Sequence, residues 1–171
     1  MNLHFSTDTS KQAVFTNVGA YIVSLGFNII NTDITRPWGG FLVIDEIQAN
    51  KFIDVFFDSA DKEGIESGKK LSPKILIVEP HKKLSWQYHH RRSELWKVIG
   101  GPAAVVKSDT DSEKEMLTYG TGAAIKLSKG ERHRLVGLDN WGIIAEIWQH
   151  TDPEDPSDEE DIVRVQDDFG R

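Results

Sequence analysis

The chain contains no cysteine among its 171 residues. Disulfides, thiolate metal sites and cysteine nucleophiles are therefore excluded, so a bound metal ion needs histidine, carboxylate or amide ligands. Long hydrophobic runs are missing as well, since none approaches the roughly 20 residues that span a bilayer. Residues 1–9 have neither the basic flank nor the apolar stretch of a signal peptide. We expect a cytoplasmic protein with no membrane partner.

An excess of positive charge is also missing. The chain has 20 Lys and Arg residues against 27 Asp and Glu residues, which gives a net charge of −7. Residues 150–171 hold nine of the acids and two of the basic residues, so the remainder balances at 18 of each sign. Nucleic-acid binding depends on clustered Lys and Arg side chains that face phosphates. No nucleic-acid partner is therefore expected.

The composition is that of an ordinary globular protein, with 39% hydrophobic and 27% charged residues. A chain of this length fits one domain, because domains average roughly 150 residues. We expect an N-terminal helix and lead-in over residues 1–35 and a second part over residues 36–171, which together form a single domain. The acidic residues predict a solvated loop at 150–160.

A helix is predicted near the N-terminus, because apolar residues recur there at steps of three and four. Thr9 or Ser10 would cap this helix and Gly26 would end it. The apolar residues of the pattern are Val14, Phe15, Val18, Ile22 and Leu25.

After residue 36 the sequence changes to short apolar runs that are separated by turn residues. These runs predict strands at 41–44, 74–78, 84–88, 94–99, 103–107, 123–127 and 143–148. The run 52–57 fits a strand or a short helix, and 58–72 is predicted to be a loop. Because no helical period separates the runs, we expect an all-β sandwich, jelly roll or barrel.

Residues 85–96 concentrate groups that bind metals. On an extended strand alternate residues face the same side, so Gln87 and His89 converge. Glu94 follows a tight turn and starts the next strand, and a second turn at 128–133 would present His133 from another strand. One amide oxygen, two imidazoles and one carboxylate suit Zn²⁺, Mn²⁺ or Fe²⁺.

Each histidine also has an ordinary interpretation, because a lone histidine is more often a polar or surface residue than a ligand. His4, His81 and His150 are interpreted in this way. His90 faces away from His89 on an extended strand, which favours a solvent or interface position.

The spacing of these residues resembles the two motifs of the cupin superfamily, Gly-x5-His-x-His-x4-Glu-x6-Gly and Gly-x5-Pro-x-Gly-x2-His-x3-Asn. The matching stretches are Gln87-x-His89-x4-Glu94-x6-Gly101 and Gly122-x5-Ser128-x-Gly130-x2-His133. The departures from the motifs are His81, Gln87, Ser128 and Gly137. A Gln-x-His pair with a later Glu and His is similar to the metal site of the phosphomannose isomerases. The resemblance implies a cupin jelly-roll β-barrel.

Other segments resemble the type II phosphomannose isomerases, which also occur as the C-terminal domain of mannose-1-phosphate guanylyltransferases. These segments are 36–39, 84–96, 133–135, 159–164 and 168–171. The chain departs from this branch in Leu95, where the branch often has His, and in an acidic loop before Glu159 that looks longer than usual.

This resemblance implies a metal-dependent isomerase that interconverts mannose 6-phosphate and fructose 6-phosphate through a cis-enediol. Such a reaction needs a base, an electrophile and a phosphate anchor. The implied metal ligands are Gln87, His89, Glu94 and His133, with Zn²⁺ as the first choice and Mn²⁺, Fe²⁺, Co²⁺ or Ni²⁺ as others.

Charged residues supply candidates for the remaining roles. Charge stabilisation is assigned to Arg92, Arg134 and Lys74. Arg36 and Arg171 are the candidate phosphate ligands, since guanidinium geometry suits the anion. Glu146 is the candidate base, with a structural ion pair as its alternative. For each of the five cationic residues the alternative is a solvated salt bridge.

Two other functions stay open at this point. One is a metal cupin of oxygenase or lyase type, against which Gln87 argues because such sites more often use a third histidine. The other is a cupin that binds a sugar or nucleotide sugar without turnover, since fold does not dictate function.

The expected partners are a small sugar phosphate and a second copy of the chain, because cupin domains commonly form dimers. The apolar residues of the C-terminal segment predict that the chain from Glu160 onward packs back and brings Arg171 toward the site. These residues are Ile162, Val163, Val165 and Phe169.

Overall fold

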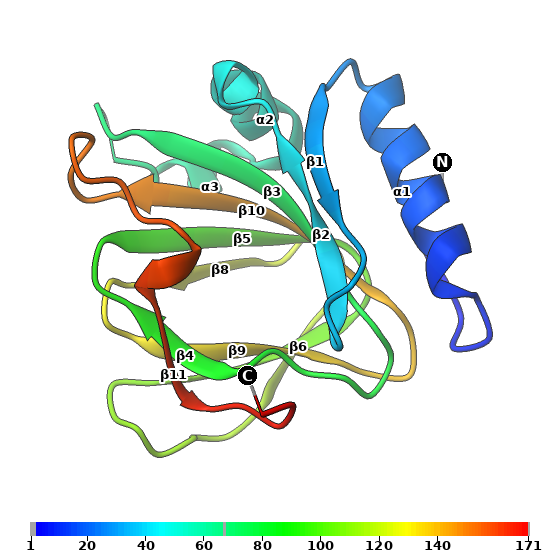
Figure 1. Ribbon diagram of the computed structural model, residues 1–171. Helices are drawn as coiled ribbons and strands as arrows, with labels where there is room; N and C mark the ends of the chain where they lie inside the picture. The colour runs from blue at the N-terminus through cyan, green and yellow to red at the C-terminus, as the bar shows by residue number, and fades with distance from the viewer. Residues whose placement is uncertain (1–2, 67, 171) are drawn as a thin grey trace.

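The computed structural model describes residues 3–66 and 68–170, and these form a barrel of two antiparallel sheets (Figure 1). The six-stranded sheet has the order β1-β2-β3-β10-β5-β8, and the five-stranded sheet has the order β11-β4-β9-β6-β7. Strands that are far apart in sequence lie side by side in both sheets, as expected of a jelly roll. The all-β prediction is confirmed.

The strands of the two sheets have the following bounds: β1 (Ile29–Asp33), β2 (Gly39–Ile44), β3 (Leu71–Val78), β4 (Trp86–His89), β5 (Arg92–Gly100), β6 (Ala103–Ser108), β7 (Leu117–Tyr119), β8 (Ala124–Leu127), β9 (Arg132–Gly137), β10 (Gly142–His150) and β11 (Ile162–Gln166). The helices are α1 (Lys11–Ser24), η1 (Glu46–Gln48), α2 (Ala49–Phe56), α3 (Ser59–Lys62) and η2 (Glu159–Asp161).

The predicted N-terminal helix is confirmed as α1. The Ser10 side chain accepts a hydrogen bond from the Ala13 N–H and caps the helix, so Ser10 rather than Thr9 is the cap. Gly26 follows the helix with a φ of 80°, which a residue without a Cβ adopts at little cost. Among the described residues, no helix is long and apolar enough to cross a membrane.

All seven predicted strands are present, as β2, β3, β4, β5, β6, β8 and β10. The ambiguous run 52–57 belongs to helix α2, whose buried residues Phe52, Ile53 and Phe56 share one helical face. The prediction of a loop over 58–72 is wrong in two places, because α3 forms within it and β3 begins at Leu71. The acidic segment after β10 contains no helix or strand until η2.

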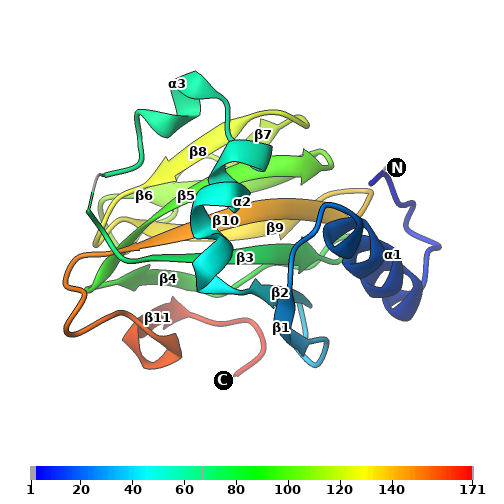
Figure 2. The same cartoon turned by 90° about the horizontal axis from the view of Figure 1, so that it is seen from above.

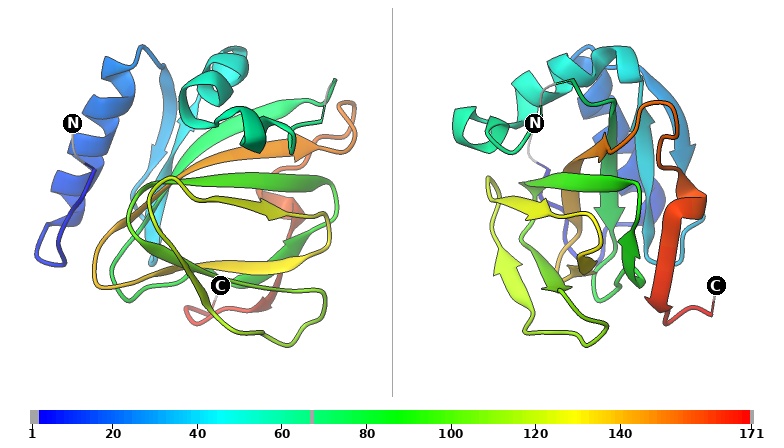
Figure 3. Two further views of the ribbon diagram at one scale, coloured as in Figure 1. Left: turned by 180° about the vertical axis from the view of Figure 1, so that it is seen from behind. Right: turned by 90° about the vertical axis from the view of Figure 1, so that its left-hand side faces the viewer.

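Two hydrophobic clusters hold these layers together. The first lies between the six-stranded sheet and helices α1 and α2, which cover its outer face (Figure 2). The second fills the space between the sheets, with Trp96, Val98, Leu135 and Ile144 fully buried there. The view from behind in Figure 3 shows the two sheets on either side of this inner core. The polar site described below therefore shares its interior with apolar side chains.

The C-terminal segment packs back on the barrel, as the sequence predicts. Strand β11 pairs with β4 at the edge of the five-stranded sheet (Figure 2), with Ile162 opposite His89 and Arg164 opposite Gln87. Arg171, the candidate phosphate ligand, lies outside the described residues.

Candidate metal centre and its pocket

Three buried side chains meet between the two sheets: His89 on β4, Glu94 on β5 and His133 on β9. The atoms that could bind a metal lie within 4.8 Å of one another. His89 Nε2 is 3.2 Å from Glu94 Oε1, and His133 Nε2 is 3.4 Å from Glu94 Oε2. The two histidines come from the five-stranded sheet and the glutamate comes from the six-stranded sheet.

A tight turn at His90 and Arg91 creates this meeting point. The chain leaves the five-stranded sheet at His89 and enters the six-stranded sheet at Arg92, so Glu94 arrives across the interior from β4. The Asp161 carboxylate accepts hydrogen bonds from the backbone N–H groups of His90 and Arg91 at 3.1 and 2.9 Å. The C-terminal segment therefore fixes the turn that positions the ligands.

The protonation of His133 leaves its second nitrogen as a bare acceptor. Nδ1 lies 2.9 Å from the carbonyl oxygen of Glu131, which can only accept, so Nδ1 carries the proton. Nε2 is buried, has no hydrogen-bond partner in the described part of the chain and faces the Glu94 carboxylate. Two buried lone pairs that face each other are unfavourable unless a cation or a proton lies between them. A divalent cation would satisfy both, so the residues fit a metal ion.

The charges around Glu94 keep it ready to act as an anionic ligand. Burial raises the pKa of Glu94, but the adjacent Arg92 guanidinium outweighs this effect and holds that pKa well below its usual range. Arg92 Nε donates to Glu94 Oε1 at 2.7 Å, and Trp96 Nε1 donates to Oε2 at 3.0 Å. Burial lowers the pKa of His89, although Glu94 opposes this, so its imidazole is neutral. A carboxylate and a neutral imidazole are the forms that bind metals.

Gln87, the fourth predicted ligand, lies in the same pocket. Its backbone is paired with that of His133, and its side chain lines the cavity together with Glu94. The amide Oε1 accepts a hydrogen bond from Ser85 Oγ at 2.6 Å, which orients the amide. A carbonyl oxygen has a second lone pair, so this bond leaves room for a further interaction.

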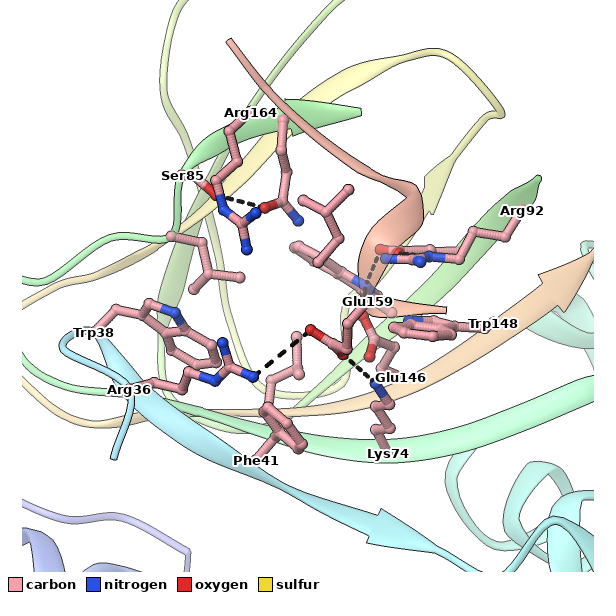
Figure 4. A pocket seen from close by; sticks show the side chains of 16 residues that line it. Arg36, Trp38, Phe41, Lys74, Ser85, Arg92, Glu146, Trp148, Glu159 and Arg164 are labelled. Carbon is pink, nitrogen blue, oxygen red and sulfur yellow. Dashed lines mark hydrogen bonds and ion pairs between the residues drawn. The ribbon is translucent and has the colours of Figure 1, made fainter. Parts of the chain in front are cut away.

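A cavity of about 50 Å³ reaches two of the predicted ligands, Gln87 and Glu94 (Figure 4). Its floor is aromatic, with Trp38, Phe41, Trp96 and Trp148 among the lining residues. The Lys74 ammonium lies 3.5 Å from the centre of the Trp148 ring. Lys74 and Arg36 bring positive charge to the wall of the cavity, in agreement with the charge expected beside a bound anion.

Glu146, the candidate base, is buried in this cavity wall. Trp96 Nε1 donates to its Oε1 at 2.9 Å, while Oε2 has no hydrogen-bond partner among the described residues. Burial and the nearby Glu94 charge raise the pKa of Glu146 to about 8, although Lys74 opposes the shift. A carboxyl group with a pKa near neutrality can both accept and donate a proton at physiological pH.

The structure brings four of the predicted cationic and acidic residues to this cavity, namely Arg36, Lys74, Arg92 and Glu146. Arg92 is fully engaged, because its guanidinium also donates to Ser157 Oγ at 2.8 Å and to the Asp158 carbonyl at 3.2 Å. It therefore links the metal ligands to the C-terminal segment.

Arg134 is not brought to the cavity. Neighbouring residues on a strand face opposite sides, so Arg134 points away from the interior that His133 faces. Its guanidinium is 1% exposed and pairs with Glu113 at 2.6 Å and with Asp168 at 3.6 Å. These ion pairs connect a loop and the C-terminal segment to β9, and charge stabilisation by Arg134 stays a prediction.

Sequence reasoning assigned no role to two residues that line the cavity, Arg164 and Glu159. Arg164 lies on β11 beside Gln87, and its buried Nε has no hydrogen-bond partner in the described part of the chain. Both residues belong to the segment 159–164, which resembles the C-terminal signature of the family. That resemblance was the sequence feature that could have indicated a role for them in the site.

The barrel and its His-Glu-His cluster define a protein of the cupin class. A mutant oxalate decarboxylase from Bacillus subtilis has the same fold, with a TM-score of 0.55 and 12% identity over 78% of this chain and 30% of that chain. Residues 48–167 match the family described as mannose-6-phosphate isomerase C-terminal. The chain belongs to this family.

Curated relatives agree with this assignment. The xanthan biosynthesis protein XanB from Xanthomonas campestris pv. campestris is 30% identical over 81% of this chain and 23% of its own length. The mannose-1-phosphate guanylyltransferase ManC from Salmonella typhimurium is 27% identical over 83% of this chain and 24% of its own length. The chain thus spans about a quarter of these relatives.

Proposed function

We propose that this protein is a metal-dependent aldose–ketose isomerase of sugar phosphates, with mannose 6-phosphate and fructose 6-phosphate as the pair. The observation that carries the proposal is the position of Glu146 in one cavity with several cationic side chains and with Glu94, the carboxylate of the His-Glu-His cluster. The family description supports the reaction, and the relatives XanB and ManC support a place in polysaccharide biosynthesis.

The isomerisation moves one proton between two carbons of the sugar. Glu146 takes the proton from C2 of the aldose, so that the released electron pair forms the C1=C2 bond and negative charge moves to the C1 oxygen. The C2 hydroxyl passes its proton to that oxygen, and Glu146 then returns its own proton to C1 as the C2 oxygen becomes the ketone carbonyl. The Trp96 N–H holds Oε1 of Glu146, which leaves Oε2 as the atom that exchanges the proton.

The other residues bind and orient the substrate. His89, Glu94 and His133, together with Gln87, would hold the metal, for which Zn²⁺ is the proposed ion. When bound, the ion would stabilise negative charge that develops on the enediol oxygens. Lys74, Arg36 and Arg164 are the proposed phosphate ligands, because they bring three positive charges to the lining of the cavity.

A coupled assay of the metal-loaded protein with mannose 6-phosphate tests the proposal. We expect turnover that chelation abolishes and that is lost in Gln87→Ala and His133→Ala. Glucose 6-phosphate and a heptose phosphate, run alongside, define the substrate. Absence of turnover with every sugar phosphate despite stoichiometric metal would refute the isomerase and favour a cupin that binds sugars without turnover.

Two further expectations from the sequence stay predictions. These are a homodimer and a cytoplasmic location. Sedimentation of the purified protein measures the first directly.

A further inference from the structure

The cationic wall of the cavity already holds an anion that belongs to the chain itself. Lys74 Nζ donates to Glu159 Oε1 at 3.0 Å, and Arg36 Nη2 lies 3.7 Å from Glu159 Oε2 (Figure 4). Burial raises the pKa of Glu159, but Lys74 and Arg36 outweigh it and keep that pKa below its usual range. The carboxylate is therefore ionised at neutral pH.

Glu159 also separates two spaces. The inner cavity beside the metal ligands measures about 50 Å³, which is far below the roughly 300–1,000 Å³ of typical ligand pockets. An outer groove of about 460 Å³ lies on the other side and carries a further cation, Lys70. Both spaces are lined by the same five residues: Arg36, Phe41, Lys74, Trp148 and Glu159. The Glu159 side chain therefore stands at the boundary between them.

The backbone on either side of Glu159 is anchored, whereas its side chain is held by its contacts with Lys74 and Arg36. Arg92 binds Ser157 and the Asp158 carbonyl, and Asp161 binds the turn at His90 and Arg91. The Glu159 side chain is 46% exposed and pairs with the two cations, Lys74 and Arg36. The side chain can therefore swing out without moving the segment that carries it.

We propose that the Glu159 carboxylate is a built-in anion that occupies the phosphate position between Lys74 and Arg36, and that an incoming phosphate must replace it. This inference rests on the proposed function for the identity of the ligand. A phosphate ester carries a charge of about −1.5 to −2 at neutral pH and three acceptor oxygens, so it competes well against one carboxylate. Its arrival joins the inner cavity to the outer groove and makes room for a sugar.

Equilibrium titration of inorganic phosphate into the metal-loaded protein tests this competition. The variant Glu159→Gln removes the charge and keeps the shape. We expect it to bind phosphate about tenfold more tightly than the wild type, a gain of about 1.4 kcal/mol. Glu160→Gln is the matched control, because Glu160 is the exposed neighbour outside the cavity lining, and it should bind phosphate as the wild type does.

A second variant keeps the test decisive. Adding Lys74→Gln to Glu159→Gln should abolish the gain in phosphate affinity. The double variant lacks the Lys74 ammonium, which phosphate would bind in place of the Glu159 carboxylate. Unchanged or weaker phosphate binding in Glu159→Gln, or a gain that survives Lys74→Gln, would overturn the proposal.

The titration is independent of the isomerase assay. Tighter phosphate binding in a protein that turns over no sugar phosphate would sustain the built-in anion and refute the isomerase. Turnover of a sugar phosphate together with unchanged phosphate binding in Glu159→Gln would support the isomerase and refute the built-in anion.

Discussion

At the scale of single residues, strand alternation decides which polar side chains reach the interior. His89 and His133 face inward, while their neighbours His90 and Arg134 face outward, one into solvent and the other into ion pairs on the outer face. The chemistry of the site therefore depends on the register of these strands. A shift of a strand by one residue would turn the inward-facing histidine outward and its neighbour inward.

Metal affinity should follow this alternation. His89→Ala and His133→Ala remove ligands, so we expect each to weaken metal binding by at least about 100-fold, more than the loss of an outer-shell partner costs. His90→Ala is the matched control and should bind metal normally, since His90 is exposed beside the site. Metal stoichiometry after dialysis, measured by elemental analysis, checks this; an equal loss in all three variants would contradict it.

The raised pKa of Glu146 predicts a stability that depends on pH. The folded protein keeps a proton on Glu146 up to about pH 8, whereas an ordinary glutamate releases it near 4.5. The free energy of unfolding of the metal-free protein should therefore fall as pH rises between these values, by up to about 1.4 kcal/mol per pH unit.

Glu146→Gln is the control for this pH dependence, because its amide cannot titrate. Denaturant unfolding at pH 5, 6.5 and 8 should show a smaller decline in the variant than in the wild type. Parallel declines would contradict the assignment of the effect to Glu146.

At the scale of elements, the C-terminal segment from Ser157 to β11 acts as a strap across the site. Asp161 accepts three hydrogen bonds, from the two turn N–H groups and from Ser157 Oγ at 2.6 Å, and Arg92 binds the same segment from within the barrel. The ligands of the metal site and the strap are therefore parts of one hydrogen-bonded unit.

Asp161→Ala should loosen this unit. The variant leaves partly buried N–H groups without partners, at a cost of about 2 kcal/mol in the free energy of unfolding. Thermal unfolding measures this loss, and Glu160→Ala, a change at the exposed neighbour, should cost less than about 0.5 kcal/mol. Similar losses in both variants would mean that the strap contributes little.

The sequence predicts the strands whose side chains are apolar and buried, such as β3 and β10, because periodicity reports burial. It does not reveal β1 and β7, which lie at sheet edges and expose most of their residues. Strand β9 begins Arg-His-Arg, a polar run whose burial is decided by tertiary packing.

The site follows the same division. Spacing along two strands was enough to group His89 with Glu94, because the turn between β4 and β5 is local. His133 comes from a third strand, β9, and joined the group through the second motif. The role of Glu159 depends on a contact with Lys74 across 85 positions of sequence. An acidic loop gives no sign of such a contact, since most such residues are solvated.

At the scale of the whole molecule, the metal ligands connect the two sheets. Binding of an ion to the folded state alone stabilises it by about 2.7 kcal/mol when the ion is present at 100 times its Kd. For a chain of this size, chelation should therefore lower Tm by about 5–10 °C. Calorimetry with and without a chelator checks this, and the shift should vanish in His133→Ala; a persistent shift would place the ion elsewhere.

The position of the ligands in both sheets also bears on the life of the protein in a cell. Without an ion, the two layers lose one connection at this point, and transient separation there exposes backbone to proteases. Degradation in cells follows the population of such opened forms. Scarcity of metal would then reduce the amount of this protein as well as its activity.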